Sequence, residues 1–249
     1  GLRLETPCTA IPIATTLAQS WDMDLIHRMG ELVGEEMKQL HVDLWLAPGM
    51  NIHRNPLCGR NFEYYSEDPV LTGLCAATET KGVQSQKGKG TTIKHFAGNN
   101  QEDNRMFTNA HISERALREI YLKGFEIAVK TAQPYAIMTS YNLINGVHSA
   151  NNYDMLQNIA RDEWGFEGLV MTDWYTSQDT TEMGMVSPSG KYSHSSSVQC
   201  IKAGNDLQMP GCQQNVDDIV EAVNEGKEIT KADLQRCAKH ILSVALKTM

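Results

Sequence analysis

The chain has 249 residues, the length of one large barrel domain or of two small domains, which is enough to bury a full core. Its net charge of −8 excludes a basic stripe that could track a nucleic-acid backbone, and no apolar run approaches the length that spans a bilayer. With 41% hydrophobic and 21% charged residues, the composition is that of an ordinary soluble globular protein.

The start of the chain and its cysteines bear on where the protein works. Gly1-Leu2-Arg3 begins without a Met and without a signal peptide, so we expect a sequence cut from a longer one. The six cysteines are scattered and form no Cys-x-x-Cys pair, which argues against a zinc site and a dense disulfide framework. Free thiols are typical of a reducing compartment and favour a cytoplasmic location, although the even number leaves a disulfide open.

Short apolar strands alternate with amphipathic helices along the chain. In chain order we expect a strand at 11–15, a helix at 24–40, a strand at 42–47, a helix at 69–86, a strand at 91–95, a helix at 113–131, a strand at 135–139, a helix at 155–163, strands at 169–171 and 203–210, and helices at 216–224 and 230–247. Polar loops are expected at 50–68, 98–105 and 187–197. Ser113 can cap its helix, and Thr230 with Asp233 forms an approximate capping box.

This alternation predicts βαβ units and a parallel α/β sheet. No break in composition divides the chain, so residues 1–249 are expected to form a single barrel domain. Six strands are too few for a closed eight-stranded barrel, so we expect a (β/α)8 TIM-like barrel that is incomplete at the N-terminus. A doubly wound open sheet is the rival, but it would want a glycine-rich phosphate loop, and no G-x-G-x-x-G or Walker motif is present.

One stretch, residues 165–174, delivers a carboxylate at the end of a buried strand. Leu169, Val170 and Met171 form an apolar run that suits a strand buried on both faces. Asp173 follows it, and a buried carboxylate must be desolvated, hydrogen-bonded or catalytic. Taken alone, the residue is better explained as a helix cap or a satisfied polar group at a strand end than as a catalytic group.

Other strand ends also finish in polar or aromatic residues, which in a barrel converge on one pocket. Those positions hold Arg60, Lys94, His95, Arg105, Met138, Tyr141, Asn142, Asp173 and Trp174. Neighbouring cations are expected to keep Asp173 ionised, which suits a nucleophile. Singly, Lys94 fits a salt-bridge partner, His95 a satisfied core histidine and Arg105 a solvated loop charge; their joint placement favours a site for a polyhydroxylated molecule.

Four motifs, in this order along the chain, resemble the barrel-domain signature of glycoside hydrolase family 3. They are Gly59-Arg60-Asn61-Phe62-Glu63 with Ser66-Glu67-Asp68-Pro69, Lys94-His95-Phe96-Ala97-Gly98-Asn99-Asn100 with Arg105, Met138-Thr139-Ser140-Tyr141-Asn142 with Asn145-Gly146, and Trp164-Gly165-Phe166 through Asp173-Trp174. The resemblance implies a retaining β-glycosidase of the β-glucosidase/β-xylosidase branch. Such an enzyme is exo-acting on terminal non-reducing β-D-glucosyl or xylosyl residues and needs neither a metal nor a cofactor.

The resemblance also implies roles for individual residues. Asp173 would be the nucleophile and Trp174 a wall of the sugar subsite. The hydroxyls of the sugar would be bound by Arg60, Lys94, His95 and Tyr141. Positions that line the same pocket in some members are matched by Arg3, Arg105 and Met138. Glu63, in the Gly-Arg-x-x-Glu motif, is expected to order the loop around Arg60.

Two departures from the family pattern concern parts of the active site. The family motif Asp-Gly-Pro-x-Gly-Leu-Arg is kept only as Gly-Leu-Arg, so the Asp that grips the sugar would lie before Gly1. The general acid/base usually comes from a second, α/β sandwich domain, so we expect such a partner and a weak or inactive isolated chain. Glu102 and Asp103 are expected to be solvated loop acids or partners of Arg105. In the branch acting on N-acetylglucosaminides, Lys-His-Phe is followed by Pro-Gly-His-Gly, whereas this chain continues differently.

Two other functions stay open from the sequence. A lysine at a strand end also fits a Schiff-base aldolase, in which Lys94 would carry the adduct. Two observations argue against an aldolase: no phosphate-binding glycine loop accompanies the cations, and Asp173 would have no role in the reaction. The second alternative is a barrel that binds sugar without hydrolysing it.

Overall fold

A four-stranded parallel sheet with the order β1-β2-β4-β7 forms the centre of the computed structural model, which describes residues 1–181 and 185–249. Its strands are β1 (Leu44–Trp45), β2 (Gly90–Phe96), β4 (Ala136–Thr139) and β7 (Leu169–Met171). Thr92 pairs with Ala136, and Ile137 pairs with Val170. A parallel bridge between Met171 and Leu207 continues the sheet beyond β7.

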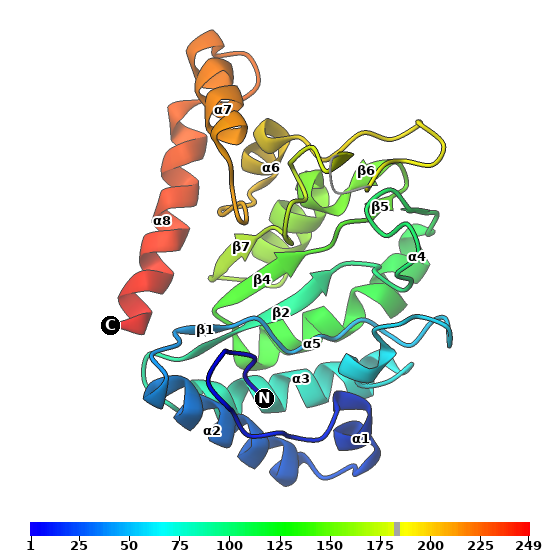
Figure 1. Ribbon diagram of the computed structural model, residues 1–249, viewed down its shortest axis with the longest axis vertical. Helices are drawn as coiled ribbons and strands as arrows, with labels where there is room; N and C mark the ends of the chain where they lie inside the picture. Colours follow the sequence, from blue (N-terminus) through cyan, green and yellow to red (C-terminus); the bar gives the residue numbers. More distant parts are fainter. Residues whose placement is uncertain (182–184) are drawn as a thin grey trace.

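Helices cover one face of this sheet, and the last helix of the chain also reaches the other face. Their bounds are α1 (Ala14–Gln19), α2 (Met23–Gln39), α3 (Pro69–Gln84), α4 (Glu114–Ala116), α5 (Lys123–Ala132), α6 (Ser197–Ala203), α7 (Gln213–Glu225) and α8 (Lys231–Thr248). The 3-10 turns are η1 (Asn61–Glu63) and η3 (Ser149–Asn151), and the π-helical segments are η2 (Leu117–Tyr121) and η4 (Asp154–Glu163). Figure 1 shows α2, α3 and α5 side by side, with α8 beside β7 at the other edge.

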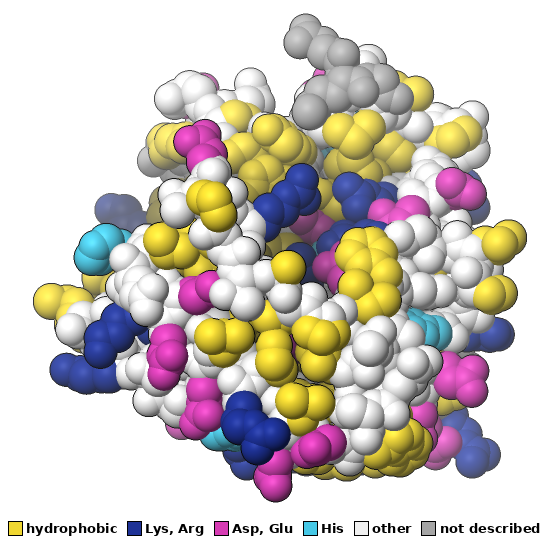
Figure 2. Space-filling model, turned by 60° about the horizontal axis from the view of Figure 1, so that its bottom comes forward, with side chains coloured by type: hydrophobic (Ala, Val, Ile, Leu, Met, Phe, Trp, Pro, Cys, Tyr) yellow, Lys and Arg dark blue, Asp and Glu magenta, His cyan; other side chains and the backbone are white. Residues whose placement is uncertain are grey.

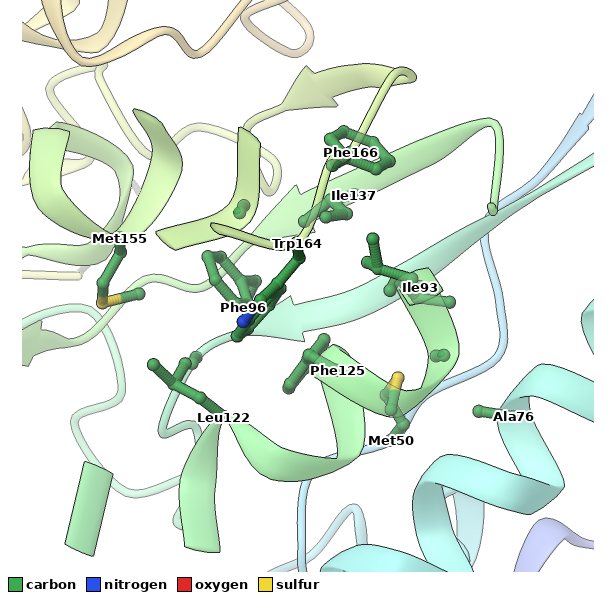
Figure 3. Close-up of a cluster of buried hydrophobic side chains, with 14 of the residues drawn as sticks. Met50, Ala76, Ile93, Phe96, Leu122, Phe125, Ile137, Met155, Trp164 and Phe166 are labelled. Atoms are coloured by element: carbon green, nitrogen blue, oxygen red, sulfur yellow. The ribbon is translucent and has the colours of Figure 1, made fainter. Parts of the chain in front are cut away.

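Hydrophobic side chains lie on both faces of the sheet, because successive residues of a strand point to opposite faces and many of them are apolar here. Ile93, Ile137 and Val170 face the helices and join a cluster that includes Phe125 and Trp164 (Figure 3). The opposite face carries a second cluster, to which α8 contributes Val244. The strand members of that second cluster are Ala136, Met138, Leu169 and Met171. Helices outside and an apolar strand face inside make this a TIM-barrel-like α/β domain.

A small second sheet lies beyond the end of β4. Its strands, β3 (Asn109–Ala110), β5 (Leu143–Ile144) and β6 (Val147–His148), have the order β3-β5-β6. The β5–β6 hairpin turns through Asn145 and Gly146, whose φ values of 49° and 89° suit the two-residue Asn-Gly turn. The sequence analysis did not predict this hairpin because each of its strands is only two residues long.

The predicted elements are largely confirmed, with two errors. Residues 11–15 were predicted as a strand, but Ile13 instead precedes α1, and the Thr15 hydroxyl donates to the carbonyls of Asn61 and Tyr64. Residues 203–210 were also predicted as a strand, but they form only the bridge at Leu207. Gly204 ends α6 with a left-handed φ of 88°, which turns the chain where the strand was expected.

The predicted helix 113–131 is divided by η2 into α4 and α5, and Ser113 caps it as expected. The capping box of Thr230 and Asp233 is confirmed at the start of α8. All six cysteines are free. Among the described residues, no helix combines the length and the apolar character needed to cross a membrane.

Asp206, beside β7, connects three parts of the fold. Its carboxylate accepts hydrogen bonds of 2.8 Å from the Arg161 guanidinium, the Val170 backbone N–H and the His240 Nδ1 atom. The side chain of Asp206 is completely buried. Through these hydrogen bonds η4, β7 and α8 are held in register.

We expect Asp206→Ala to lower the free energy of unfolding by about 3–5 kcal/mol, because it leaves a buried guanidinium without its counter-charge. Urea denaturation monitored by circular dichroism measures the change. The matched control is Glu163→Ala, which breaks an exposed pair with Arg118 and should cost less than about 1 kcal/mol. Equal effects of the two variants would show that burial of the Asp206 pair has no energetic consequence.

Candidate active site

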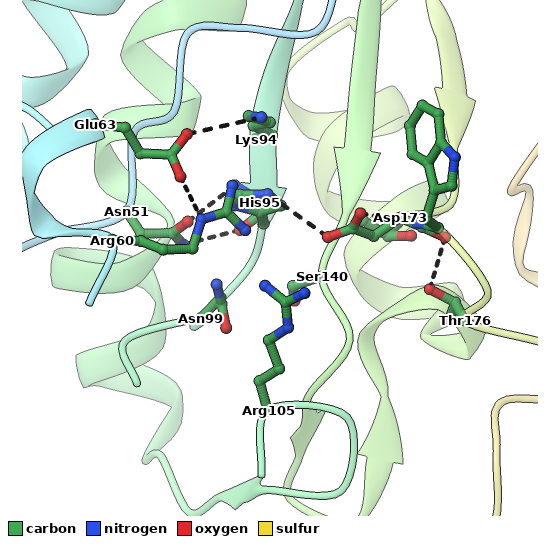
Figure 4. Close-up of polar contacts among 12 residues, drawn as sticks. Asn51, Arg60, Glu63, Lys94, His95, Asn99, Arg105, Ser140, Asp173 and Thr176 are labelled. Carbon is green, nitrogen blue, oxygen red and sulfur yellow. Dashed lines mark hydrogen bonds and ion pairs between the residues drawn. The ribbon is translucent and has the colours of Figure 1, made fainter. Parts of the chain in front are cut away.

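Five charged or titratable side chains converge at the carboxyl ends of the strands. Lys94 and His95 lie near the end of β2, and Asp173 lies two residues after β7. Arg60 comes from the loop after β1, and Arg105 comes from the loop after β2. Figure 4 shows them pointing toward one another, and Figure 2 shows a face on which basic and acidic side chains gather in a hollow. The predicted convergence of strand ends is therefore observed for these residues.

Asp173 has one carboxylate oxygen engaged and one open. Its Oδ1 atom accepts a 2.8 Å hydrogen bond from the Trp174 backbone N–H, and its carbonyl accepts one of 2.9 Å from the Thr176 hydroxyl. Its Oδ2 atom is buried, has no hydrogen-bond partner among the described residues, and lies 3.6 Å from His95 Nε2. The turn after β7 thus fixes the carboxylate and leaves one oxygen available.

The ionisation of Asp173 depends on opposing effects. Burial is the largest and raises the pKa of the carboxyl group above its usual value. The Trp174 N–H and then the cations Arg60, Lys94 and Arg105 lower the pKa again. From the sequence, the neighbouring cations were expected to have the larger effect on the pKa of Asp173 and to keep it ionised. Desolvation has the larger effect instead, because the carboxylate is only 7% exposed.

Glu63 holds two of the cations in place. Its carboxylate accepts a hydrogen bond from Arg60 Nε and forms an ion pair of 3.7 Å with Lys94 Nζ. Burial, the largest influence, lowers the pKa of Lys94, and Glu63 opposes that shift. Within the described part of the chain, only the Nε atom of Arg60 has a hydrogen-bond partner, so its terminal N–H groups remain as donors. The contact fits the expected role of Glu63 in ordering the loop around Arg60.

The other side of the cluster is formed by Arg105 and Tyr141. Arg105 donates a 2.8 Å hydrogen bond to Glu102, and its guanidinium lies 4.7 Å from the centroid of the Tyr141 ring. Burial, followed by the nearby charge of Asp173, raises the pKa of the Tyr141 hydroxyl, which therefore stays protonated. Glu102 is thus a partner of Arg105, whereas Asp103 is exposed.

The remaining residues expected at the site differ in their exposure and in their relation to the charged cluster. Met138 is buried in the cluster on the inner face of β4, and Trp174 is 38% exposed beside Asp173 in sequence. Arg3 is exposed in the N-terminal segment, and its neighbour Leu2 packs against α2 and α3. Among the described residues, no hydrogen bond or ion pair joins Arg3 to the cluster. Asn142 donates to the Ala97 carbonyl and supports the loop.

Three buried residues at the site were missed by the sequence analysis. The Tyr64 hydroxyl lies 3.2 Å from His95 Nδ1, and Asn99 Nδ2 lies 3.2 Å from the Tyr64 hydroxyl. Asn51 exchanges two hydrogen bonds with the backbone of His95. Two adjacent tyrosines, Tyr64 and Tyr65, in a loop rich in polar residues were the signal that could have drawn attention to Tyr64.

The chemistry of this cluster is that of a hydrogen-bonding pocket. Across residues 1–181 and 185–249, His, Cys, Asp and Glu side chains do not gather in threes as a metal site would require. The arrangement offers N–H donors from two arginines, a lysine and a histidine around one open carboxylate oxygen. Such a pocket suits a neutral molecule with several hydroxyl groups and an electrophilic carbon.

Comparisons with known proteins agree on one family. The profile of the Glycosyl hydrolase family 3 N terminal domain matches residues 1–244. The chain is 48% identical over 97% of its length to an exo-alpha-(1->6)-L-arabinopyranosidase of Bifidobacterium longum, of which it covers 29%. It is 42% identical over its whole length to a beta-glucosidase of Ruminococcus albus, of which it covers 26%.

Solved structures show the same likeness. The GH3 beta-glucosidase of Bifidobacterium adolescentis matches 100% of this chain with a TM-score of 0.87 and 47% identity, and the match covers 34% of that protein. The beta-glucosidase 3B of Thermotoga neapolitana, in complex with alpha-D-glucose, matches 96% of the chain with a TM-score of 0.86 and 47% identity. The chain spans about a quarter to a third of the length of the relatives it matches. It belongs to glycosyl hydrolase family 3 and corresponds to the N-terminal domain of that family.

Proposed function

We propose that this domain carries the nucleophile and the sugar-binding residues of a retaining, exo-acting β-glycosidase. The substrate would be a terminal, non-reducing β-D-glucosyl or xylosyl residue. The observation that carries the proposal is the open Oδ2 atom of Asp173, which is buried at the end of β7 and surrounded by N–H donors. The names of the related proteins support the substrate class.

In the first step, Asp173 Oδ2 attacks the anomeric carbon and forms a glycosyl ester, while the glycosidic oxygen leaves with a proton from a general acid. In the second step, a water molecule attacks the same carbon, releases the carboxylate and gives its proton back to that acid. Two inversions leave the configuration unchanged. The donors of Arg60, Lys94 and His95 would hold the sugar hydroxyls, and the exposed Trp174 indole would cover an apolar face of the ring.

The general acid/base would come from outside the described cluster, from an α/β sandwich domain of the whole protein. Retaining chemistry needs a second carboxyl group roughly 5 Å from the first. Besides Asp173, two carboxylates contact the cluster, and both are committed: Glu63 to Arg60 and Lys94, and Glu102 to Arg105 and Asn99. Groups held by cations in this way act as acceptors rather than as proton donors.

A second glycone has support from the comparisons. The related exo-alpha-(1->6)-L-arabinopyranosidases act, by their names, on an α-L-arabinopyranoside. In the usual chair, both that sugar and a β-D-glucoside carry an equatorial glycosidic bond, so one nucleophile position serves both. Nitrophenyl β-D-glucoside, β-D-xyloside and α-L-arabinopyranoside, compared by kcat/KM, separate the candidates. The aldolase alternative is not supported, because Lys94 is ion-paired and the family is one of glycosidases.

The proposal predicts which residue becomes labelled by a mechanism-based 2-fluoroglycoside. The fluorine slows both steps, so the glycosyl ester accumulates on the nucleophile. Mass spectrometry of peptides from the inactivated full-length gene product should place the sugar on Asp173. A label on any other carboxylate would remove the basis of the proposal.

We expect the rate of inactivation to fall at low pH with a midpoint above the ordinary pKa of an aspartate, because Asp173 is buried and must be ionised to attack. This fall is the acid limb of the pH profile. Arg60→Gln removes a cation that lowers this pKa, so the limb should move to higher pH. Inactivation by the 2-fluoroglycoside, measured from pH 3 to pH 9, reports the free enzyme. Arg118→Gln, on an exposed helix surface, should leave the limb unchanged. Movement to lower pH in Arg60→Gln would contradict the assignment.

A further inference from the structure

The imidazole of His95 can present either a donor or an acceptor to Asp173, depending on which nitrogen carries its proton. Burial, followed by the charges of Arg60, Lys94 and Arg105, lowers the pKa of His95 well below its usual value. The ring is therefore neutral and carries one N–H. Its Nε2 atom lies 3.6 Å from Asp173 Oδ2.

A chain of hydrogen bonds that reaches His95 Nδ1 begins at Glu102. The Oε2 atom of Glu102 accepts a bond of 2.8 Å from Arg105, so the group is a carboxylate and can only accept. Its Oε1 atom lies 3.2 Å from Asn99 Nδ2, which orients the amide with its NH2 group toward the carboxylate. Asn99 Oδ1 has no partner among the described residues, so nothing there favours the flipped orientation.

The Asn99 amide in turn orients the hydroxyl of Tyr64. Asn99 Nδ2 is also 3.2 Å from the Tyr64 oxygen, which therefore accepts. Burial raises the pKa of Tyr64, so its proton stays in place and needs an acceptor. In the described part of the chain, the hydroxyl has two partners: Asn99 Nδ2, which can only donate, and His95 Nδ1 at 3.2 Å. The hydroxyl must donate to Nδ1.

The position of the ring is fixed separately from its proton. Asn51 Nδ2 donates to the His95 carbonyl at 2.8 Å, and Asn51 Oδ1 accepts from the His95 backbone N–H at 2.9 Å. The Tyr64 ring meets the imidazole edge to face, with 6.2 Å between centroids. Asn51 and the ring contact thus hold the imidazole, while the hydroxyl of Tyr64 decides where its proton lies.

We propose that Tyr64 and Asn99 are positioning residues that place the single proton of His95 on Nε2, facing Asp173. The consequence for catalysis rests on the proposed function of Asp173 as the nucleophile. With the proton on Nε2, His95 donates toward the open carboxylate oxygen or toward a sugar hydroxyl bound against it. In the other tautomer, a lone pair on Nε2 would face that oxygen, and the two acceptors would repel.

Asp173 itself could also favour a proton on Nε2, so the test must separate the two causes. The full-length gene product is labelled with ¹⁵N-histidine, and the His95 signals are identified by their loss in His95→Gln. In the unsubstituted protein, Nδ1 should give a pyridine-type shift and Nε2 a pyrrole-type shift. Asp173→Ala should keep this pattern, because the Tyr64 hydroxyl remains. Asp173→Ala with Tyr64→Phe should give a mixture of both tautomers.

Tyr65→Phe is the matched control, because Tyr65 is an equally buried neighbour whose hydroxyl donates to Glu79 instead. In the Asp173→Ala background it should leave the Nε2–H pattern intact. A proton on Nδ1 in the unsubstituted protein, loss of the pattern in Asp173→Ala alone, or an equal shift with Tyr65→Phe would each overturn the proposal. So would an unchanged pattern when Tyr64→Phe is added.

A kinetic measurement gives a second readout with Asp173 present. Tyr64→Phe should lower kcat/KM by roughly three- to ten-fold, the effect of one lost hydrogen bond. Tyr65→Phe should leave it within about two-fold, and an equal loss in both would contradict a specific role of Tyr64. The tautomer measurement needs no turnover, so it can succeed or fail independently of 2-fluoroglycoside labelling at Asp173.

Discussion

Replacing Asp173 with Ala should reduce kcat on aryl β-glucosides by a factor on the order of 10⁶, the loss typical when a covalent catalyst is deprived of its nucleophile. The carboxylate is fixed by the Trp174 N–H, and its open oxygen has no neighbour that could replace it in attack. His95 Nε2 lies 3.6 Å from that oxygen and is expected to carry a proton, and the nearby Tyr141 hydroxyl has a raised pKa, so neither group can attack. Initial rates with the full-length gene product measure the effect.

The same variant offers a chemical check that loss of folding cannot imitate. Removal of the side chain leaves a space at the end of β7 that a small anion can enter. Azide should restore turnover of a dinitrophenyl β-glucoside and yield an α-glycosyl azide, because attack comes from the face that Asp173 occupied. Asp179→Ala, an exposed carboxylate later in the same loop, is the control and should change kcat little. A β-configured azide product would place the nucleophile elsewhere.

The sheet could be predicted because its strands follow one physical rule. Leu169, Val170 and Met171 are apolar in succession, and the structure buries that strand on both faces between two clusters. The same rule failed at 203–210, where Leu207 and Met209 look like strand residues. Asn205 and Asp206 are buried there and bond to other elements, and this tertiary pairing has no local pattern.

The charged half of the site was predictable for a related reason. Parallel strands all end at the same edge of a sheet, so Lys94, His95 and Asp173 had to meet once the strands were located. Tyr64 and Asn99 could not be placed in this way. Their contact depends on the loop after β1 lying over the loop after β2. The path of a loop leaves no periodic pattern of apolar residues in the sequence, whereas a strand repeats every two residues and a helix every 3.6.

The 249-residue chain produced alone should cleave aryl and sugar leaving groups with different defects. General acid catalysis is typically worth 10²–10⁴-fold, and the cluster carboxylates Glu63 and Glu102 are both held by cations. A dinitrophenolate leaves without protonation, whereas the sugar alkoxide of a disaccharide does not. We therefore expect the isolated chain to lose about 10²–10⁴-fold more activity, relative to the full-length gene product, on a β-linked glucose disaccharide than on dinitrophenyl β-glucoside.

For each protein, the rate on the disaccharide is divided by the rate on the dinitrophenyl substrate, and the two quotients are compared. A general loss of folded protein or of sugar affinity lowers both rates alike and therefore cancels. The nucleophile is present in both proteins, and 2-fluoroglycoside labelling of Asp173 in the isolated chain provides the control for a folded site. Disaccharide cleavage by the isolated chain at the full-length rate would mean that the proton donor lies within these residues. Glu102 would then be the first candidate, because it stands beside Arg105 in the cluster, and Glu102→Gln should abolish disaccharide cleavage while sparing the dinitrophenyl substrate. Asp103, which is exposed in the same loop, would be the second, tested by Asp103→Asn.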